Sequence, residues 1–147
     1  MSVPLSERKP SSYQVIDTAL SIYETTLRLC LKLPKRYTHL VFQKMVDLAS
    51  EVSDYARKAK SIAPTNKQEA DLRILYWIES KASLMALISK INILIEIPNI
   101  MVYVDERGHT HGAKQKELEQ LSNLLNDELN LLQQIIVEDR KKFKKLY

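Results

Sequence analysis

Apolar residues recur every three or four positions over most of the chain. Residues 11–33 carry such a stripe at Val15, Ile16, Ala19, Leu20, Tyr23, Leu27, Cys30 and Leu31. Residues 38–62 carry one at Val41, Met45, Leu48, Val52, Tyr55 and Ala59, and residues 113–145 carry one at Leu118, Leu121, Leu125, Leu129, Leu132 and Ile136. Because this spacing gathers the apolar side chains on one face of a helix, each segment is predicted to be amphipathic and helical.

Proline and glycine interrupt helices, and here they fall between the apolar segments. The interruptions are Pro4, Pro10, Pro34, Pro64, Pro98, Gly108 and Gly112. Four helices are therefore predicted, at about residues 11–33, 38–62, 65–97 and 113–145. Because the connections at Pro34 and Pro64 are short, consecutive helices must run antiparallel. The sequence predicts an all-α, up-down-up-down four-helix bundle over residues 11–147, after a flexible segment 1–10.

Local signals mark two of the helix starts. Ser11 and Gln14 have the spacing of a capping box, and Thr65 and Gln68 have the same spacing. These pairs predict that the first helix starts beside Ser11 and the third beside Thr65. The longest connection, residues 98–112, is predicted to form a small extended arm or hairpin.

The third segment is apolar around more of its circumference than a helix with one buried face needs. Ten of the fourteen residues from Leu84 to Ile97 are Leu, Met, Ile or Ala. A second apolar surface must therefore be covered. Two explanations remain open: the helix is central in its own bundle, or its outer face packs against another protomer.

The composition indicates one globular, helix-rich domain. The 147 residues are 45% apolar and 27% charged and include two glycines, and a chain of this length buries one useful core. The single cysteine, Cys30, excludes an internal disulfide. The first ten residues lack the apolar region of a signal peptide, and Leu84–Ile97 is too short to span a membrane. We therefore expect a cytoplasmic protein that does not engage a membrane.

The basic residues are unevenly placed. The net charge is +4, and residues 138–147 hold five Lys or Arg against two acidic residues, which gives +3. Residues 28–60 hold eight Lys or Arg against three acidic residues, which gives +5. Acidic residues elsewhere compensate the second concentration. A basic run at the end of a helix also complements the helix dipole or aids solubility, so charge alone leaves its role open.

Motifs that would support catalysis are missing from the sequence. His109 and His111 lie beside Asp105 and Glu106, but no further ligand at standard spacing completes a zinc site. Cys30 lies on an apolar stripe, as expected of a small buried side chain. There is no glycine-rich phosphate loop and no nucleophile or metalloprotease motif. The protein is predicted not to be an enzyme and to bind neither a metal nor another cofactor.

One aromatic pair allows two interpretations. Tyr76 and Trp77 lie near Arg73 and Lys81, a combination that single-strand-binding proteins use for stacking and phosphate contact. Helical spacing also places such residues in a core. Core packing is the favoured interpretation.

Two stretches resemble a known family. The first is Leu31-Lys-Leu-Pro-Lys-Arg-Tyr-Thr38 followed by Val41-Phe-Gln-Lys-Met45, and the second is Lys67-Gln-Glu-Ala-Asp-Leu-Arg-Ile-Leu75. They are similar to the junction, second helix and third-helix opening of a small four-helix-bundle family. This family includes proteins encoded in ribosomal RNA intervening sequences and the accessory variability determinant of diversity-generating retroelements. The resemblance covers about residues 13–140.

The resemblance implies a barrel-like homopentamer without enzymatic activity, a basic surface for RNA or DNA and, in the retroelement branch, a reverse-transcriptase partner. Residues 131–136 lack the glycine-containing segment usual in that branch, and the connection 98–112 is longer.

Two functions are predicted as alternatives. The first is a nucleic-acid-binding accessory protein in which the cations contact phosphates without reading bases. The second is an interaction scaffold that uses the second apolar face of the third helix. The candidate phosphate contacts are Lys32, Lys35, Arg36, Arg57, Lys58, Lys60, Arg140, Lys141, Lys142, Lys144 and Lys145.

Overall fold

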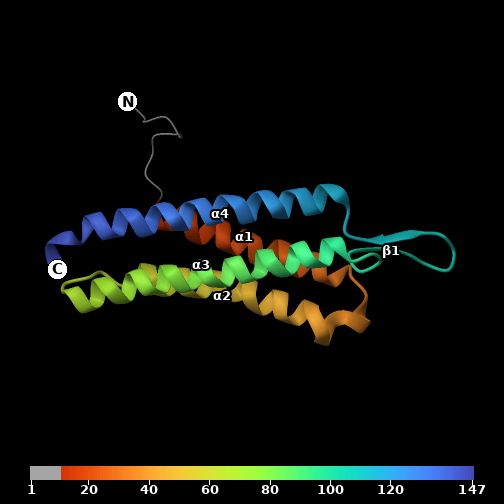
Figure 1. Ribbon diagram of the computed structural model, residues 1–147, viewed down its shortest axis with the longest axis horizontal. Coiled ribbons are helices and arrows are strands. Elements are labelled where there is room, and N and C mark those ends of the chain that lie inside the picture. The colour runs from red at the N-terminus through yellow and green to blue at the C-terminus, as the bar shows by residue number, and fades with distance from the viewer. Residues whose placement is uncertain (1–10) are drawn as a thin grey trace, which may run out of the picture.

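The computed structural model describes residues 11–147 and forms a bundle of four long helices (Figure 1). The helices are α1 (Ser12–Leu31), α2 (Gln43–Ser61), α3 (Lys67–Glu96) and α4 (Gln115–Lys142). The predicted all-α four-helix bundle is confirmed. The segment 1–10 that was predicted to be flexible lies outside the described residues.

Each helix packs against two neighbours. The helix α1 contacts α2 and α4, and α3 contacts the same two helices from the opposite side. An ion pair between Lys32, just after α1, and Glu117, at the start of α4, confirms that these two helices run antiparallel. The four rods thus form one closed up-down-up-down arrangement around a shared core.

The helix starts agree with the capping predictions at one position and differ at another. The Ser11 side chain accepts a hydrogen bond from the Gln14 backbone N–H, as predicted for α1. The third helix starts later than the predicted Thr65–Gln68 box, because Asn66 caps it and accepts from the backbone N–H of Glu69. The Glu69 carboxylate accepts in return from the Asn66 side-chain amide, which makes Asn66 the better cap.

The second helix is irregular at its start. Lys35–Tyr37 form a 3-10 turn (η2) and Thr38–Phe42 form a π-helical turn (η3), so regular α-helix begins at Gln43 and not at residue 38 as predicted. Phe42 is buried in the core, where its ring meets that of Tyr37 edge to face at 6.2 Å. This buried ring anchors the irregular turn to the bundle.

The connection between α3 and α4, for which an extended arm or a hairpin was predicted, forms a hairpin. The strands β1 (Val102–Val104) and β2 (Thr110–Gly112) pair antiparallel, and they project beyond the ends of the helices (Figure 1). Gly112 closes the hairpin onto the bundle with a φ of +100°. A β-carbon at this position would lie 2.3 Å from the Met101 carbonyl oxygen, so only glycine fits.

The helix α3 has one buried and one exposed apolar face. Its buried face includes Ile74, Trp77, Leu84, Leu87, Ile91 and Leu94. Its other face exposes Leu72, Leu75, Ile78, Met85 and Ile93. The residues 11–147 of one chain therefore leave the second apolar surface uncovered, so a central position within its own bundle does not explain it. No helix in this part of the chain has the length and apolar content needed to cross a membrane.

Candidate nucleic-acid interface

The predicted phosphate contacts fall at two opposite ends of the bundle. We call the end where α1 begins and α4 finishes the C-terminal end, and the end that carries β1 and β2 the hairpin end. Eight candidates lie at the C-terminal end: Arg57, Lys58, Lys60, Arg140, Lys141, Lys142, Lys144 and Lys145. The other three, Lys32, Lys35 and Arg36, lie at the hairpin end. The 19 residues of α2 separate the two groups by about 28 Å.

Both ends are positive and the waist between them is negative. Residues 11–17, 54–73 and 138–147 at the C-terminal end hold ten Lys or Arg and six acidic residues. Residues 28–44 and 90–120 at the hairpin end hold nine and five. The intervening helix segments hold one lysine and six acidic residues, and five of these six lie outside the core because Glu128 is buried. The basic concentration seen at residues 28–60 in the sequence is therefore two separate surfaces, because α2 carries its two halves to opposite ends.

The cations of the hairpin end are partly engaged with carboxylates. The Lys32 ammonium donates to both carboxylate oxygens of Glu117 at 2.9 Å, and this contact lowers the Glu117 pKa. Arg28 donates to Glu24 one helical turn away at 2.6 Å. By contrast, Arg140, Lys141, Lys144 and Lys145 are exposed and form no ion pair with another residue in the range 11–147. The C-terminal end thus offers more cations to an incoming anion.

A buried ion pair fixes the base of the C-terminal end. The Arg73 Nε donates to the Asp139 Oδ2 at 2.7 Å, and the Trp77 indole N–H donates to the same oxygen at 2.8 Å. Arg73 also donates to the Ile62 carbonyl oxygen at 2.9 Å. These bonds join α3, α4 and the connection after α2. Arg73 therefore has a structural role, and the buried Trp77 confirms the predicted core packing.

The chain after α4 folds back instead of extending the helix. The sequence suggested that the basic run would continue as helix, but α4 finishes at Lys142 and Lys144–Leu146 form a 3-10 turn (η4). The Tyr147 hydroxyl then donates to the Asp71 carboxylate on α3 at 2.6 Å, which raises the Tyr147 pKa. This contact holds the last residues against the bundle, so the tail cations occupy a defined place.

Aromatic rings and ammonium groups meet repeatedly at this end. The Lys60 ammonium lies 2.9 Å from the centroid of the Tyr13 ring, which joins the end of α2 to the start of α1. Tyr55 and Tyr76 stack with centroids 6.2 Å apart, and Lys58 lies 4.9 Å from the centroid of Tyr55. Each contact combines a π-face with a cation, as in the sites that bind single-stranded nucleic acids.

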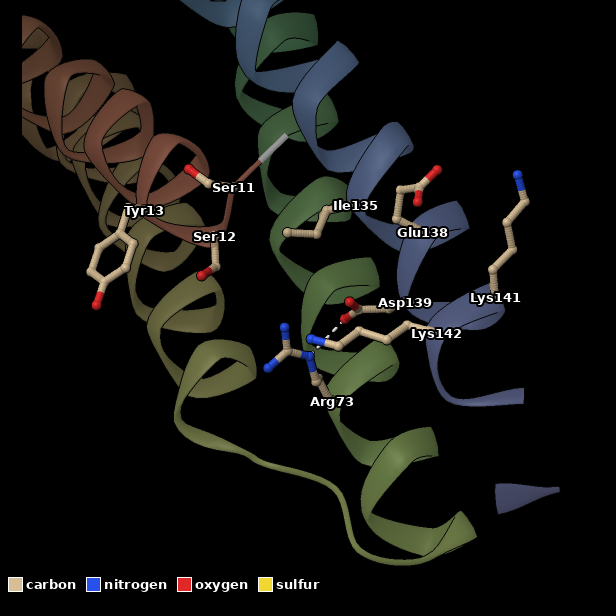
Figure 2. A pocket seen from close by; sticks show the side chains of 9 residues that line it. All are labelled: Ser11, Ser12, Tyr13, Arg73, Ile135, Glu138, Asp139, Lys141 and Lys142. Atoms are coloured by element: carbon tan, nitrogen blue, oxygen red, sulfur yellow. Dashed lines mark hydrogen bonds and ion pairs between the residues drawn. The ribbon is translucent and has the colours of Figure 1, made fainter. Parts of the chain in front are cut away.

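A groove of about 680 Å³ opens between α1, α3 and α4 at the same end. We call it the C-terminal groove. Figure 2 shows that Lys142 reaches toward Arg73 at the floor of the groove, and that Tyr13 stands at the opposite rim. Tyr13 and Lys142 therefore lie on opposite sides of the groove. Its lining residues are Ser11, Ser12, Tyr13, Arg73, Ile135, Glu138, Asp139, Lys141 and Lys142.

The histidine cluster belongs to the hairpin. His111 Nε2 lies 2.6 Å from the Asp105 carboxylate, and this hydrogen bond is the largest cause of the lowered Asp105 pKa. The His111 ring also stacks on Tyr103 at 5.3 Å. Within residues 11–147, no group of three His, Cys, Asp or Glu side chains is arranged to hold a metal ion. The contacts of these side chains thus brace the hairpin.

Cys30 was predicted to be a small buried side chain, and it packs against the core of the bundle. It is only partly buried and lines an apolar groove between α1 and the turn η3. Desolvation raises its pKa to about 11, which keeps the thiol protonated at neutral pH. A protonated thiol is a weak nucleophile.

The Lys67 ammonium lies 5.7 Å from the centroid of the Tyr147 ring. The sequence alone did not place Tyr13, Lys67 or Tyr147 at the C-terminal end. The antiparallel topology supplies the missing signal, because it brings the first turns of α1 and α3 beside the last turns of α2 and α4. Comparison with protein-family models, curated proteins and solved structures finds no match to this chain. The candidate interface is therefore defined by its own geometry and charge.

Proposed function

We propose that the protein is a non-enzymatic accessory protein that binds the backbone of RNA or DNA through its C-terminal end. The observation that carries this proposal is that eight candidate cations lie at one end of the bundle, two of them in the lining of a groove, and that an acidic segment separates this end from the other. Phosphate contacts of this kind position a protein on nucleic acid without reading its sequence. The resemblance of the helix junctions to the intervening-sequence and retroelement family supports the same function, and a reverse transcriptase is the partner implied by the retroelement branch.

The test compares two matched pairs of substitutions by fluorescence anisotropy over a series of salt concentrations. The double variant Lys141→Gln, Lys142→Gln removes two exposed charges from the C-terminal end. We expect weaker binding to every sequence and a salt slope reduced by about 1.8 for duplex DNA, or about 1.4 for single strands. The control Lys35→Gln, Arg36→Gln removes two exposed charges from the hairpin end and should leave the slope nearly unchanged. A larger loss in the control would move the interface to the hairpin end.

A second candidate function is supported by the exposed face of α3. Leu75, Ile78, Ala82 and Met85 follow the alternating spacing of three and four residues that is typical of a helix-packing seam, and all four are exposed. We propose that this seam packs against another copy of the chain, which makes the protein a helical interaction scaffold. The family resemblance implies a pentamer, which at 17.0 kDa per chain has a mass of about 85 kDa.

Light scattering tests the assembly directly. The unmodified protein should have a mass that is a multiple of the mass of one chain. Leu75→Glu with Met85→Glu should reduce this mass to that of one chain, because the apolar contacts of both positions with the other copy are lost. The helical circular-dichroism signal should remain, since these two positions are exposed within one chain. A mass of one chain for the unmodified protein at high concentration would contradict the scaffold.

A further inference from the structure

The C-terminal groove differs from a plain basic patch because an exposed aromatic ring stands at its rim. The Tyr13 side chain is 68% exposed although the Lys60 ammonium lies 2.9 Å from its ring centroid. The cation and the start of α1 hold the ring in place while most of its surface faces solvent. A held, solvent-facing ring is a platform on which a base can stack.

The charges around the groove suit a phosphate beside such a base. Lys141 and Lys142 contribute two exposed ammonium groups from α4. The Asp139 carboxylate on the floor is neutralised by Arg73 at 2.7 Å and is only 5% exposed, so it repels an incoming anion little. Figure 2 shows the Glu138 carboxylate directed away from Arg73. Lys142 reaches toward Arg73 in the same view, so its ammonium group supplies positive charge near the floor.

The size of the groove and the position of the ring favour a single strand over a duplex. Its volume of about 680 Å³ lies within the range of pockets that take small organic molecules, so one nucleotide fits. A base can reach the ring only when it is free of its complementary strand, because bases in a duplex are stacked and paired with their faces covered. A duplex would contact only the lysines at the rim.

We infer that the C-terminal groove binds an unpaired nucleotide of single-stranded RNA or DNA, with the base stacked on Tyr13 and the adjacent phosphate against Lys142, which reaches into the groove. This inference rests on the proposed function and names its substrate class. It predicts a preference for single strands over duplexes, with little dependence on base identity, because every base has a π-face.

The experiment measures the affinity of three fluorescent probes of equal length: an oligothymidylate, an abasic strand with the same phosphates, and a duplex. The unmodified protein should bind oligothymidylate at least about five-fold more tightly than the abasic strand, since stacking on one ring contributes at least that factor. An oligouridylate should behave like oligothymidylate. Tyr13→Leu should lower the affinity for the oligothymidylate to that for the abasic strand and leave the abasic strand unaffected.

Two controls separate stacking from charge and from general damage. Tyr13→Phe retains the ring and should retain the preference, whereas Tyr103→Leu removes a tyrosine from the hairpin end and should change nothing. Lys141→Gln with Lys142→Gln should weaken both single-stranded probes by the same factor. Equal affinity for oligothymidylate and the abasic strand, or no effect of Tyr13→Leu, would overturn the inference while leaving phosphate binding intact. Absence of binding to all probes at low salt would overturn the proposed function as well.

Discussion

Glu128 places an ionisable carboxyl group inside the core of the bundle. Its side chain is fully buried, and neither carboxyl oxygen has a hydrogen-bond partner among residues 11–147. Burial raises its pKa from 4.5 to about 9, because the core stabilises the neutral form over the charged one. The folded protein therefore carries a protonated Glu128 at pH 7, while the same group is ionised in the unfolded chain.

This difference makes the free energy of unfolding fall as the pH rises. Between the two pKa values the folded state holds one proton that the unfolded state releases, so unfolding becomes easier by about 1.4 kcal/mol for each pH unit. The contribution of the Glu128 proton to the free energy of unfolding is complete below pH 4.5 and is lost progressively up to about pH 9. Between pH 5 and pH 8 the predicted loss from this one group is on the order of 4 kcal/mol.

Urea unfolding followed by circular dichroism at several pH values measures this loss. Glu128→Gln keeps the size of the side chain and removes its titration, so the difference between the unmodified protein and this variant isolates the Glu128 contribution. That difference should grow steadily in favour of the variant as the pH rises. Glu128→Leu should be more stable still, because it removes an unsatisfied buried polar group that costs about 1–3 kcal/mol. Equal pH slopes for the unmodified protein and Glu128→Gln would refute the reasoning.

Three further predictions concern other parts of the bundle. Asp139→Ala should lower the free energy of unfolding in urea by about 3–5 kcal/mol, because it leaves Arg73 buried without its partner. Removal of the exposed Arg28 should lower it by under about 1 kcal/mol, and equal losses would contradict the structural role of the buried pair. Gly112→Ala should speed amide hydrogen exchange in the hairpin by displacing the Met101 carbonyl, with little change in the helices. Unchanged exchange would show that the backbone at this position accommodates a side chain. At pH 8, Cys30 should react with iodoacetamide about 100-fold more slowly than a model thiol, since its pKa is about 11, and rapid reaction would show that its groove is more open to solvent.

The candidate site was partly predictable from the sequence. The cations of residues 138–147 could be identified directly, because a basic run in the last turn of a helix is visible in the order of residues. The grouping of residues 28–60 as one basic concentration was wrong as a description of the surface. Residues at the two ends of the 19-residue helix α2 are close in the sequence but lie far apart in space. The buried ion pair of Arg73 and Asp139 joins residues 66 positions apart, and only the packed helices bring them together.

Local signals in the sequence account for the class of fold and its connectivity. Apolar periodicity, the proline breaks and the Ser11 cap are local properties, and they predicted the four antiparallel helices that the structure contains. Which residues share an end depends on how the helices pack, because antiparallel packing brings the start of one helix beside the end of the next. Tyr13 meets Lys60, and Tyr147 meets Asp71, for that reason. Tertiary packing likewise leaves one apolar face of α3 exposed and buries Glu128. Each helix has two neighbours in this bundle, and the sequence of a helix alone does not say which of its faces those neighbours cover.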